Sequence, residues 1–229
     1  MCLSEEEMTL DDLQNGYFIY QLKDGFRFGA DAVLLSDFAD IKKDETVMDL
    51  GTGTGIIPIL LAAKTEGRSF TGIDIQERCI AAAKRSIAYN RLEGRVEAFC
   101  ADLRDASKIF GRESFDAVVS NPPYMAGNDG KHSGDDARAI ARHEVCCSFE
   151  DVARAASELL KSNGRFFLIH RPQRLAELVV TLTRFRLEPK RMRFVHPYAD
   201  KEPSMVMIEC LKGGKQGMNV ERPVIMYKP

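Results

Sequence analysis

From about residue 45 the chain alternates short apolar segments with longer amphipathic ones, and this alternation constrains its fold more than any other feature. Short β-branched runs, each followed by a segment of helical periodicity, are typical of βαβ units and a parallel sheet. The alternation predicts seven strands, over residues 46–50, 69–75, 96–103, 115–121, 164–170, 190–196 and 204–212. It predicts helices over residues 55–67, 76–92, 149–161 and 174–185. The last two strands leave no room for a helix between them, which predicts an antiparallel hairpin at the sheet edge.

A glycine-rich turn, in the segment DLGTGTG, follows the first expected strand. Asp49 closes the strand, and Gly51, Gly53 and Gly55 lead into the next helix. Glycines allow a tight bend and a close approach of the backbone to a ligand, and the free N–H groups at a helix start attract polar groups. A dinucleotide site has its third glycine where Ile56 stands here, so the turn favours a cofactor without a pyrophosphate and disfavours a dehydrogenase.

Two further acids stand where the second and third strands are expected to end. Asp74 is placed to accept hydrogen bonds from ribose hydroxyls, or alternatively to cap the helix that begins with DIQE. Asp102 is placed to accept a hydrogen bond from an adenine amino group. Ligands of open α/β sheets bind outside the carboxyl ends of the strands, so acids at three successive strand ends predict a nucleotide-like ligand there.

The fourth expected strand ends in the segment SNPPY, residues 120–124. Consecutive prolines fix φ and lack N–H donors, so Pro122 and Pro123 should hold a rigid turn whose carbonyls point outward. The side chain of Asn121 adds an acceptor beside them, and Tyr124 offers a face on which a planar base can stack. Such a fork can grip a planar NH₂ group and aim its nitrogen at an electrophile held by the glycine turn.

Together, the glycine turn and the N-P-P-Y segment resemble class I S-adenosylmethionine-dependent methyltransferases of the amino-methylating kind, over roughly residues 28–170. The segments GFRFGADAVLLSDF, ARHE, HRPQRLAEL and KGGKQGMNVERPVIMY look like the bacterial tRNA adenine-N6 methyltransferases that modify a valine tRNA next to its anticodon. The resemblance implies S-adenosylmethionine as cofactor and a tRNA substrate. It also implies a Rossmann-like α/β fold, with a mostly parallel seven-stranded sheet, an antiparallel edge hairpin and helices on both faces.

Individual roles follow from the same resemblance. The cofactor residues are Asp49, Gly51, Gly53 and Gly55 at the methionine and ribose, Asp74 at the ribose hydroxyls, Asp102 at the adenine, and Asn121 at the border with the substrate. The residues expected to hold the target base are Asn121, Pro122 and Tyr124.

Residues 1–44 are expected to form an N-terminal extension that closes over the cofactor site, and residues 45–229 the methyltransferase domain. Within the extension, Phe28, Gly29 and Asp31 would cover the methionine end of the cofactor, although Asp31 can equally well open an ordinary capped helix.

Other substrates use similar motifs. Glutamine-N5 methylation of a protein also needs a grip on a planar NH₂ group, but those enzymes carry a helical N-terminal domain for which the 1–44 segment is short. Guanine-N2 methylation of rRNA and adenine methylation of DNA would use the same fork. A non-catalytic nucleotide-binding or RNA-binding module is a fourth alternative, disfavoured by the presence of both motifs. His143 and Glu144 are expected to be structural, because an alkylated aromatic amine loses its proton without a strong base.

Charge is distributed unevenly along the chain. Residues 161–229 contain 14 Lys and Arg against 6 Asp and Glu, whereas the whole chain carries a net charge of −2. This basic C-terminal third favours a polyanionic partner such as tRNA, or else a solvated surface. No apolar run reaches the ~20 residues of a membrane span and the N-terminus is acidic, which predicts a cytoplasmic protein without a membrane partner.

The six cysteines show no zinc-type spacing, so no metal is expected, and adjacent Cys146 and Cys147 are interpreted as small apolar residues. Residues 125–140, which are rich in glycine and polar side chains, are expected to form a long loop, of a length that is usually either functional or disordered.

Overall fold

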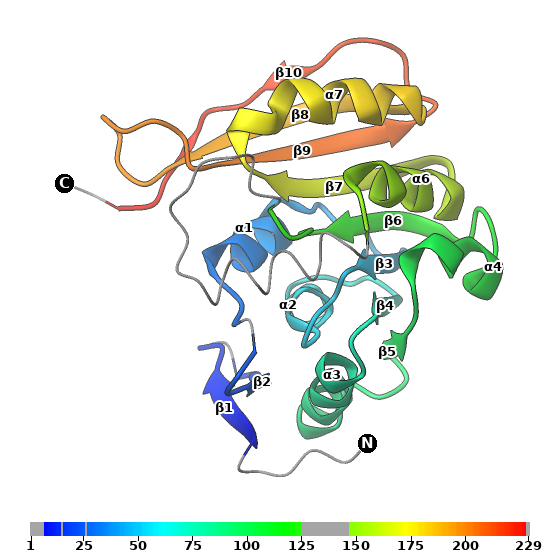
Figure 1. Cartoon of the computed structure of the whole chain (residues 1–229), viewed down its shortest axis with the longest axis vertical. Helices are drawn as coiled ribbons and strands as arrows, with labels where there is room; N and C mark the ends of the chain where they lie inside the picture. The colour runs from blue at the N-terminus through cyan, green and yellow to red at the C-terminus, as the bar shows by residue number, and fades with distance from the viewer. Residues whose placement is uncertain (1–6, 15, 26, 125–146, 228–229) are drawn as a thin grey trace.

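The computed structural model describes residues 7–14, 16–25, 27–124 and 147–227, and the main sheet within these ranges has nine strands, of which the seven longer ones correspond to the strands expected from the sequence (Figure 1). Their order is β5-β4-β3-β6-β7-β9-β8. The bounds are β3 Thr46–Leu50, β4 Ser69–Asp74, β5 Val96–Cys100, β6 Phe115–Ser120, β7 Leu160–His170, β8 Leu187–His196 and β9 Met205–Lys212. Strand β9 is antiparallel to β7 and β8, and the other pairs among these seven are parallel. The expected sheet and its antiparallel hairpin are confirmed.

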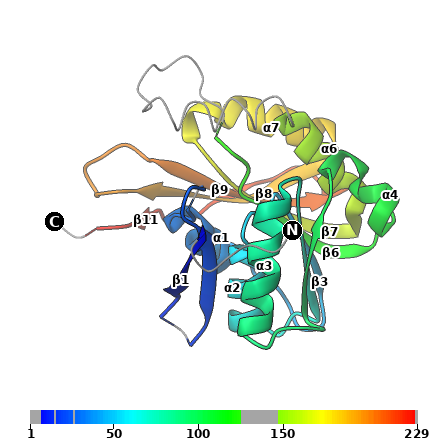
Figure 2. The same cartoon turned by 60° about the horizontal axis from the view of Figure 1, so that its bottom comes forward.

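Helices cover both faces of this sheet, as Figure 2 shows with α6 and α7 on one side and α1, α2 and α3 on the other. The bounds are α1 Ala30–Phe38, α2 Ile56–Lys64, α3 Glu77–Tyr89, α4 Ala106–Phe110, α6 Phe149–Leu159 and α7 Leu175–Arg184. Short 3₁₀ helices occupy Leu103–Asp105 (η2) and Pro172–Arg174 (η3). None of the helices in the described ranges is both long and apolar enough to span a membrane.

The strands are apolar on both faces because each face is covered. Successive side chains of a strand point to opposite faces. In β7, Phe167 and Ile169 therefore join the core under α1, α2 and α3, whereas Phe166 and Leu168 join the core under α6 and α7. This two-sided burial explains why the central strands read as continuous apolar runs.

The N-terminal segment contains a hairpin that the sequence did not predict. Strands β1 (Met8–Asp12) and β2 (Phe18–Leu22) pair antiparallel in a separate two-stranded sheet. The hairpin docks on α3, because the main-chain N–H of Phe18 donates to Asn90 Oδ1 at 2.8 Å and that of Tyr20 donates to Ser86 Oγ at 2.9 Å. The following helix, α1, buries Leu35 and Phe38 in the core beneath the sheet.

Several element boundaries differ from expectation. Strand β5 ends at Cys100, and η2 and α4 follow where no helix was expected. Strand β7 begins at Leu160, directly after α6, because Leu160 already pairs with Phe115 before a register shift in β6. Two short strands, β10 (Asn219–Val220) and β11 (Val224–Ile225), also add to the sheet beyond β8.

Candidate functional site

The carboxyl ends of the parallel strands form one rim of the sheet, and the glycine turn lies on it between β3 and α2. Gly51, Gly53 and Gly55 have φ values of 79°, 55° and 85°, in the left-handed region that favours glycine. Among the described residues, no atom lies within 4 Å of a Cβ placed on Gly51 or Gly53, whereas a Cβ on Gly55 would lie 3.1 Å from Ala83 Cβ. The first two glycines therefore leave open space above the backbone, and the third lets α2 pack closely against α3.

Asp49, beneath this turn, is a buried acid. Its side chain is 1% exposed, and neither carboxylate oxygen has a hydrogen-bond partner among the described residues. Burial raises the pKa of Asp49 to about 7. The nearby Thr52 side chain opposes this rise, although it does not meet the geometry of a regular hydrogen bond, and the negative charge of Asp74 adds to the rise. Buried polar groups are normally satisfied, so these oxygens are suited to a donor or cation from a ligand.

Asp74, at the end of β4, braces the glycine turn. Its Oδ2 accepts the N–H of Gly53 at 2.9 Å, and its Oδ1 accepts the N–H of Gln76 at 2.9 Å. Gln76, rather than Asp74, occupies the N-cap of α3, so the simple capping interpretation is wrong. Because each carboxylate oxygen can accept more than one hydrogen bond, Asp74 retains the capacity to bind ligand hydroxyls.

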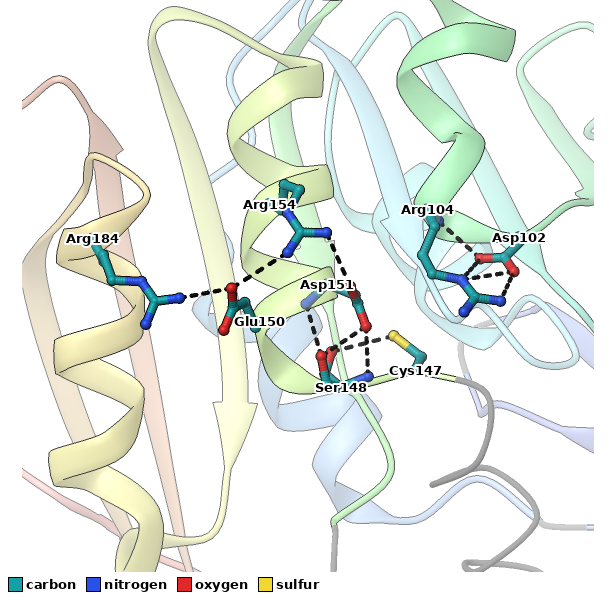
Figure 3. A network of polar contacts seen from close by, with 8 residues as sticks. All are labelled: Asp102, Arg104, Cys147, Ser148, Glu150, Asp151, Arg154 and Arg184. Carbon is teal, nitrogen blue, oxygen red and sulfur yellow. Dashed lines mark hydrogen bonds and ion pairs between the residues drawn. The ribbon is translucent and has the colours of Figure 1, made fainter.

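Asp102 lies two residues beyond β5 and is paired with Arg104 (Figure 3). Arg104 Nε lies 3.0 Å from both oxygens of Asp102, and the main-chain N–H of Arg104 donates to Oδ1 at 2.9 Å. These contacts hold the pKa of Asp102 below its usual value, with the side-chain hydrogen bond from Arg104 as the main cause. Arg104 is a neighbour that the sequence did not indicate.

The N-P-P-Y segment begins directly after β6. Ser120 Oγ donates to the carbonyl of Leu50 at 2.8 Å, which ties the end of β6 to the end of β3. The Tyr124 hydroxyl lies 3.0 Å from Asn121 Oδ1 and 3.0 Å from Asp31 Oδ2, so its single hydrogen is shared between two acceptors. Burial and the nearby charge of Asp31 raise the pKa of Tyr124, which keeps the hydroxyl protonated. Pro122 is buried beside this pair.

Asp31 brings the N-terminal segment to the same place. It lies inside the first turn of α1, whose N-cap is Gly29, and its Oδ1 accepts the N–H of Ala32 at 2.9 Å. A Cβ on Gly29 would lie 2.9 Å from Asp31 Oδ1, so a larger residue there would require the Asp31 carboxylate to shift. The N–H of Phe28 donates to Gln21 Oε1 at 3.0 Å. The fold thus joins the 28–31 segment to the N-P-P-Y segment through the bond between Asp31 and Tyr124.

Two residues at the end of β7 belong to this cluster, although the sequence assigned them no role. The guanidinium of Arg171 lies 4.6 Å from the centre of the Tyr124 ring, and the His170 ring makes an edge contact with Tyr124 at 5.4 Å. Burial, aided by Arg174, lowers the pKa of His170 to about 4, so the ring is neutral at pH 7. The available signal was their position: they close the strand next to β6, within the segment HRPQRLAEL.

Other predicted features lie outside the described residues: the 125–140 loop, His143, Glu144 and Cys146. Cys147 is described, and its Sγ donates to the carbonyl of Ser148 at 3.3 Å. Within the described ranges, no group of three His, Cys, Asp or Glu side chains is arranged to hold a metal ion.

Much of the basic C-terminal third is neutralised within the fold. Arg184 pairs with Glu150 at 2.7 Å (Figure 3). Arg191 pairs with Glu209 at 2.6 Å, and Arg193 pairs with Glu221. Cations of this third that have no acid partner among the described residues are Arg171, Arg186, Lys190, Lys215 and Arg222.

Comparison with known proteins decides the family. The family model for the methyltransferase small domain matches residues 23–185, which include the glycine turn and the N-P-P-Y segment. The chain belongs to the methyltransferase small domain family. This methyltransferase is 32% identical over 189 residues to a protein of Porphyromonas gingivalis named tRNA1(Val) (adenine(37)-N6)-methyltransferase, covering 80% of this chain and 73% of the relative. It is 29% identical over 202 residues to a protein of the same name from Phocaeicola vulgatus, covering 86% and 84%. The family expected from the sequence is confirmed.

Solved structures agree on the fold. The methyltransferase is similar to a crystal structure described as a predicted O-methyltransferase of Agrobacterium tumefaciens, with a TM-score of 0.70, 25% identity and coverage of 86% of this chain and 88% of that one. It also matches TYW2 of P. horikoshii with a TM-score of 0.63, 15% identity and coverage of 93% and 74%. The second likeness supports the fold alone.

Proposed function

We propose that this protein transfers a methyl group from S-adenosylmethionine to the exocyclic N6 amine of an adenosine in tRNA. The observation that carries the proposal is the position of Asn121. Its side-chain oxygen is fixed at the end of β6, next to Pro122 and Tyr124, on the same rim as the glycine turn. The end of β6 is tied to the end of β3 through Ser120, so acceptor and turn have a fixed relation.

The residues at the turn fit the cofactor. The space above Gly51 and Gly53 accommodates a ligand close to the backbone. The Asp49 oxygens, which have no hydrogen-bond partner in the described part of the chain, suit donors of the amino-acid moiety. Asp74 would accept the ribose hydroxyls while bracing the turn, and Asp102, held by Arg104, would face the adenine. When bound, the cofactor supplies an electrophilic methyl group on a sulfonium.

The N-terminal segment supports the cofactor side of the proposal. Phe28, Gly29 and Asp31 would line the methionine end, because Asp31 already contacts Tyr124 across the rim. In the same way, the 1–44 extension would close over the cofactor, with the 45–229 domain beneath it. Packing of α1 against the core of that domain is consistent with a fixed rather than a loosely tethered cover.

Asn121 would act on the target amine. One lone pair of its side-chain oxygen faces the Tyr124 hydroxyl, and the second is available to accept a hydrogen from the NH₂ group. Such a bond turns the nitrogen lone pair out of conjugation with the ring and aims it, which lowers the barrier mainly in the transition state. Pro122 would hold the adjacent carbonyl outward, and Tyr124 would stack on the base.

The tRNA substrate, and position 37 of valine tRNA in particular, is supported by the names of the relatives. A tRNA substrate would place the protein in the cytoplasm. Guanine-N2 methylation of rRNA and glutamine-N5 methylation of a protein would use the same fork, and the relatives favour adenine over both.

Only some of the cations in the basic C-terminal third are available to bind tRNA. Arg184, Arg191 and Arg193 already form ion pairs within the fold. We therefore assign phosphate contacts to the cations without acid partners, among them Arg171, Arg186 and Lys215. Affinity for unmodified tRNA should fall steeply with salt, because each neutralised phosphate releases counterions.

Nucleoside mass spectrometry of tRNA from cells with and without the gene tests the proposal. N6-methyladenosine should disappear from the valine tRNA when the gene is deleted and return with the parental gene but not with Asn121→Ala. Unchanged N6-methyladenosine in the deletion strain, together with loss of a different modified nucleoside, would reassign the substrate.

A further inference from the structure

Two exposed tyrosines lie against each other beyond the end of β8. Tyr198 is 42% exposed and Tyr227 is 53% exposed, and their ring centres are 5.5 Å apart with the planes tilted by 42°. Backbone hydrogen bonds hold both residues in place. The main-chain N–H of Tyr227 donates to the carbonyl of Pro197 at 2.9 Å, and that of Lys201 donates to the carbonyl of Tyr198 at 3.1 Å. The pair therefore presents aromatic surface in a defined place.

This tyrosine pair lies on the same rim as the N-P-P-Y segment. His170 of β7 and Phe194 of β8 both stand opposite Val206 of β9, so β7 and β8 end at the same side of the sheet. In Figure 1 the β8–β9 connection and the C-terminal segment project from the side toward which β6 and β7 point. Neighbouring strands are about 4.8 Å apart, which puts the end of β8 roughly 10 Å along the rim from the end of β7.

Arg171 connects the two places. Its guanidinium lies over the Tyr124 ring, and its Nη1 donates to the carbonyl of Ser204 at 3.1 Å. The main-chain N–H of Ser204 in turn donates to the carbonyl of Val195 at 2.8 Å, at the end of β8. The rim is thus continuous from the proposed base site to the tyrosine pair, and the residue that links them, Arg171, is a cation.

The charges near Tyr198 and Tyr227 do not favour a phosphate-binding site. The adjacent loop carries Asp200, Lys201 and Glu202, and Lys201 lies 3.6 Å from the Asp200 carboxylate. A segment with no excess of positive charge attracts phosphate weakly. Exposed aromatic rings, in contrast, bind unpaired bases by stacking, independently of their sequence.

We propose that Tyr198 and Tyr227 form a stacking platform for unpaired bases that flank the target nucleotide of the RNA substrate. The inference rests on the proposed function, since it requires a single-stranded RNA segment at the Asn121 fork. A base extruded into that fork leaves its neighbours unstacked. The platform lies within one to a few nucleotides of the fork along the rim and replaces the lost stacking.

The test measures equilibrium binding of fluorescently labelled, unmodified tRNA to the full chain. The variants are Tyr198→Leu and Tyr227→Leu, which keep an apolar side chain but remove the ring, and Tyr198→Trp, which keeps a ring. Each Leu variant should weaken binding roughly fivefold to hundredfold, the range of stacking on one base, and Tyr198→Trp should bind as the parent does. The weakening should be equal at low and physiological salt, because stacking releases no counterions.

Tyr89→Leu is the matched control. Tyr89 is also half-exposed and in contact with other rings, Phe18 and Tyr20, but it ends α3 away from the rim. It should leave tRNA affinity unchanged, and thermal melting should show that all variants fold. Leu variants that are folded and bind like the parent would overturn the platform, whatever the chemical activity. Failure of the parent to methylate tRNA would instead overturn the proposed function, because binding is measured without turnover.

Discussion

On the β3–β4 side of the rim, Asp74 accepts hydrogen bonds from the main-chain N–H groups of Gly53 and Gln76, whereas on the β6–β7 side Asn121 contacts the side chain of Tyr124. The first side is held by backbone: three left-handed glycines and one bracing acid fix it within a short stretch of chain. The second is held by side chains from distant segments, since Tyr124 also contacts Asp31 and Arg171.

This difference suggests that the β3–β4 side serves the cofactor and the β6–β7 side serves the substrate. A backbone-built pocket suits a cofactor that is the same in every turnover, because its shape depends on few side chains. A site built from side chains on separate elements can be altered one residue at a time, which suits a substrate that differs among related enzymes. Substitutions on the two sides should therefore affect different measurable quantities.

The largest expected effect concerns Asp49. Its pKa of about 7 in the fold exceeds the ordinary value of 3.8, so the folded protein keeps a proton that the unfolded chain releases. Stability should therefore fall as pH rises from about 4 to 7, by an amount that linkage puts at about 4 kcal/mol. Asp49→Asn should remove this slope in urea unfolding of the cofactor-free protein at about pH 5 and pH 8. His170, whose lowered pKa acts in the opposite direction, is common to both proteins. Equal slopes in parent and variant would show that Asp49 is ionised at neutral pH.

The next effect is on the substrate side. Asn121→Ala should lower single-turnover methylation of tRNA by about 10²–10³-fold, the loss expected for one preorganised polar group, without changing cofactor affinity. Tyr124→Phe is the matched variant, because it keeps the ring and removes only the hydroxyl that contacts Asn121 and Asp31. It should lose less activity than Asn121→Ala. If the two variants instead weakened cofactor binding, the β6–β7 side of the rim would also contribute to the cofactor site, and the two sides would not have separate roles.

A smaller effect is expected on the cofactor side from Asp74→Ala. Loss of a hydrogen-bonded acid should weaken S-adenosylmethionine binding by about 1.5–3 kcal/mol. Asp105→Ala, which removes a half-exposed acid paired with Lys108, is the control and should leave the affinity unchanged. Calorimetry measures both. Parental affinity in Asp74→Ala would remove this residue from the site.

The smallest effect separates structural from RNA-binding cations. Arg191 donates to the carbonyl of Phe38 at 2.8 Å and pairs with Glu209, so Arg191→Ala should destabilise the fold by about 1–2 kcal/mol. Its tRNA affinity should stay within about twofold of the parent, whereas Arg171→Ala should reduce the affinity and its salt dependence. A stronger effect on tRNA from Arg191→Ala than from Arg171→Ala would reverse this assignment.

The same difference explains what the sequence could predict. The order of strands and the cofactor turn depend on local signals, namely apolar alternation and the spacing of Gly51, Gly53 and Gly55, and the structure reproduces the elements they predict. The N-P-P-Y turn is likewise a local signal.

Contacts between segments that are distant in the chain could not be predicted from local sequence patterns. The bond between Asp31 and Tyr124 joins residues 93 positions apart, and the pairing of Arg191 with Glu209 depends on strand register. A count of charges along the sequence treats Arg191 as a free cation, whereas in the fold Glu209 neutralises its charge. The roles of His170 and Arg171 became visible only once β7 was placed next to β6.

The central claim is that the Asn121 fork presents an adenine amine to the cofactor side of the rim. The most direct measurement incubates the purified chain with unmodified valine tRNA and methyl-labelled S-adenosylmethionine, digests the tRNA and identifies the labelled nucleoside by mass spectrometry. The account predicts label in N6-methyladenosine with the parent and about 10²–10³-fold less with Asn121→Ala. Label in N2-methylguanosine, or equal labelling by parent and Asn121→Ala, would contradict it.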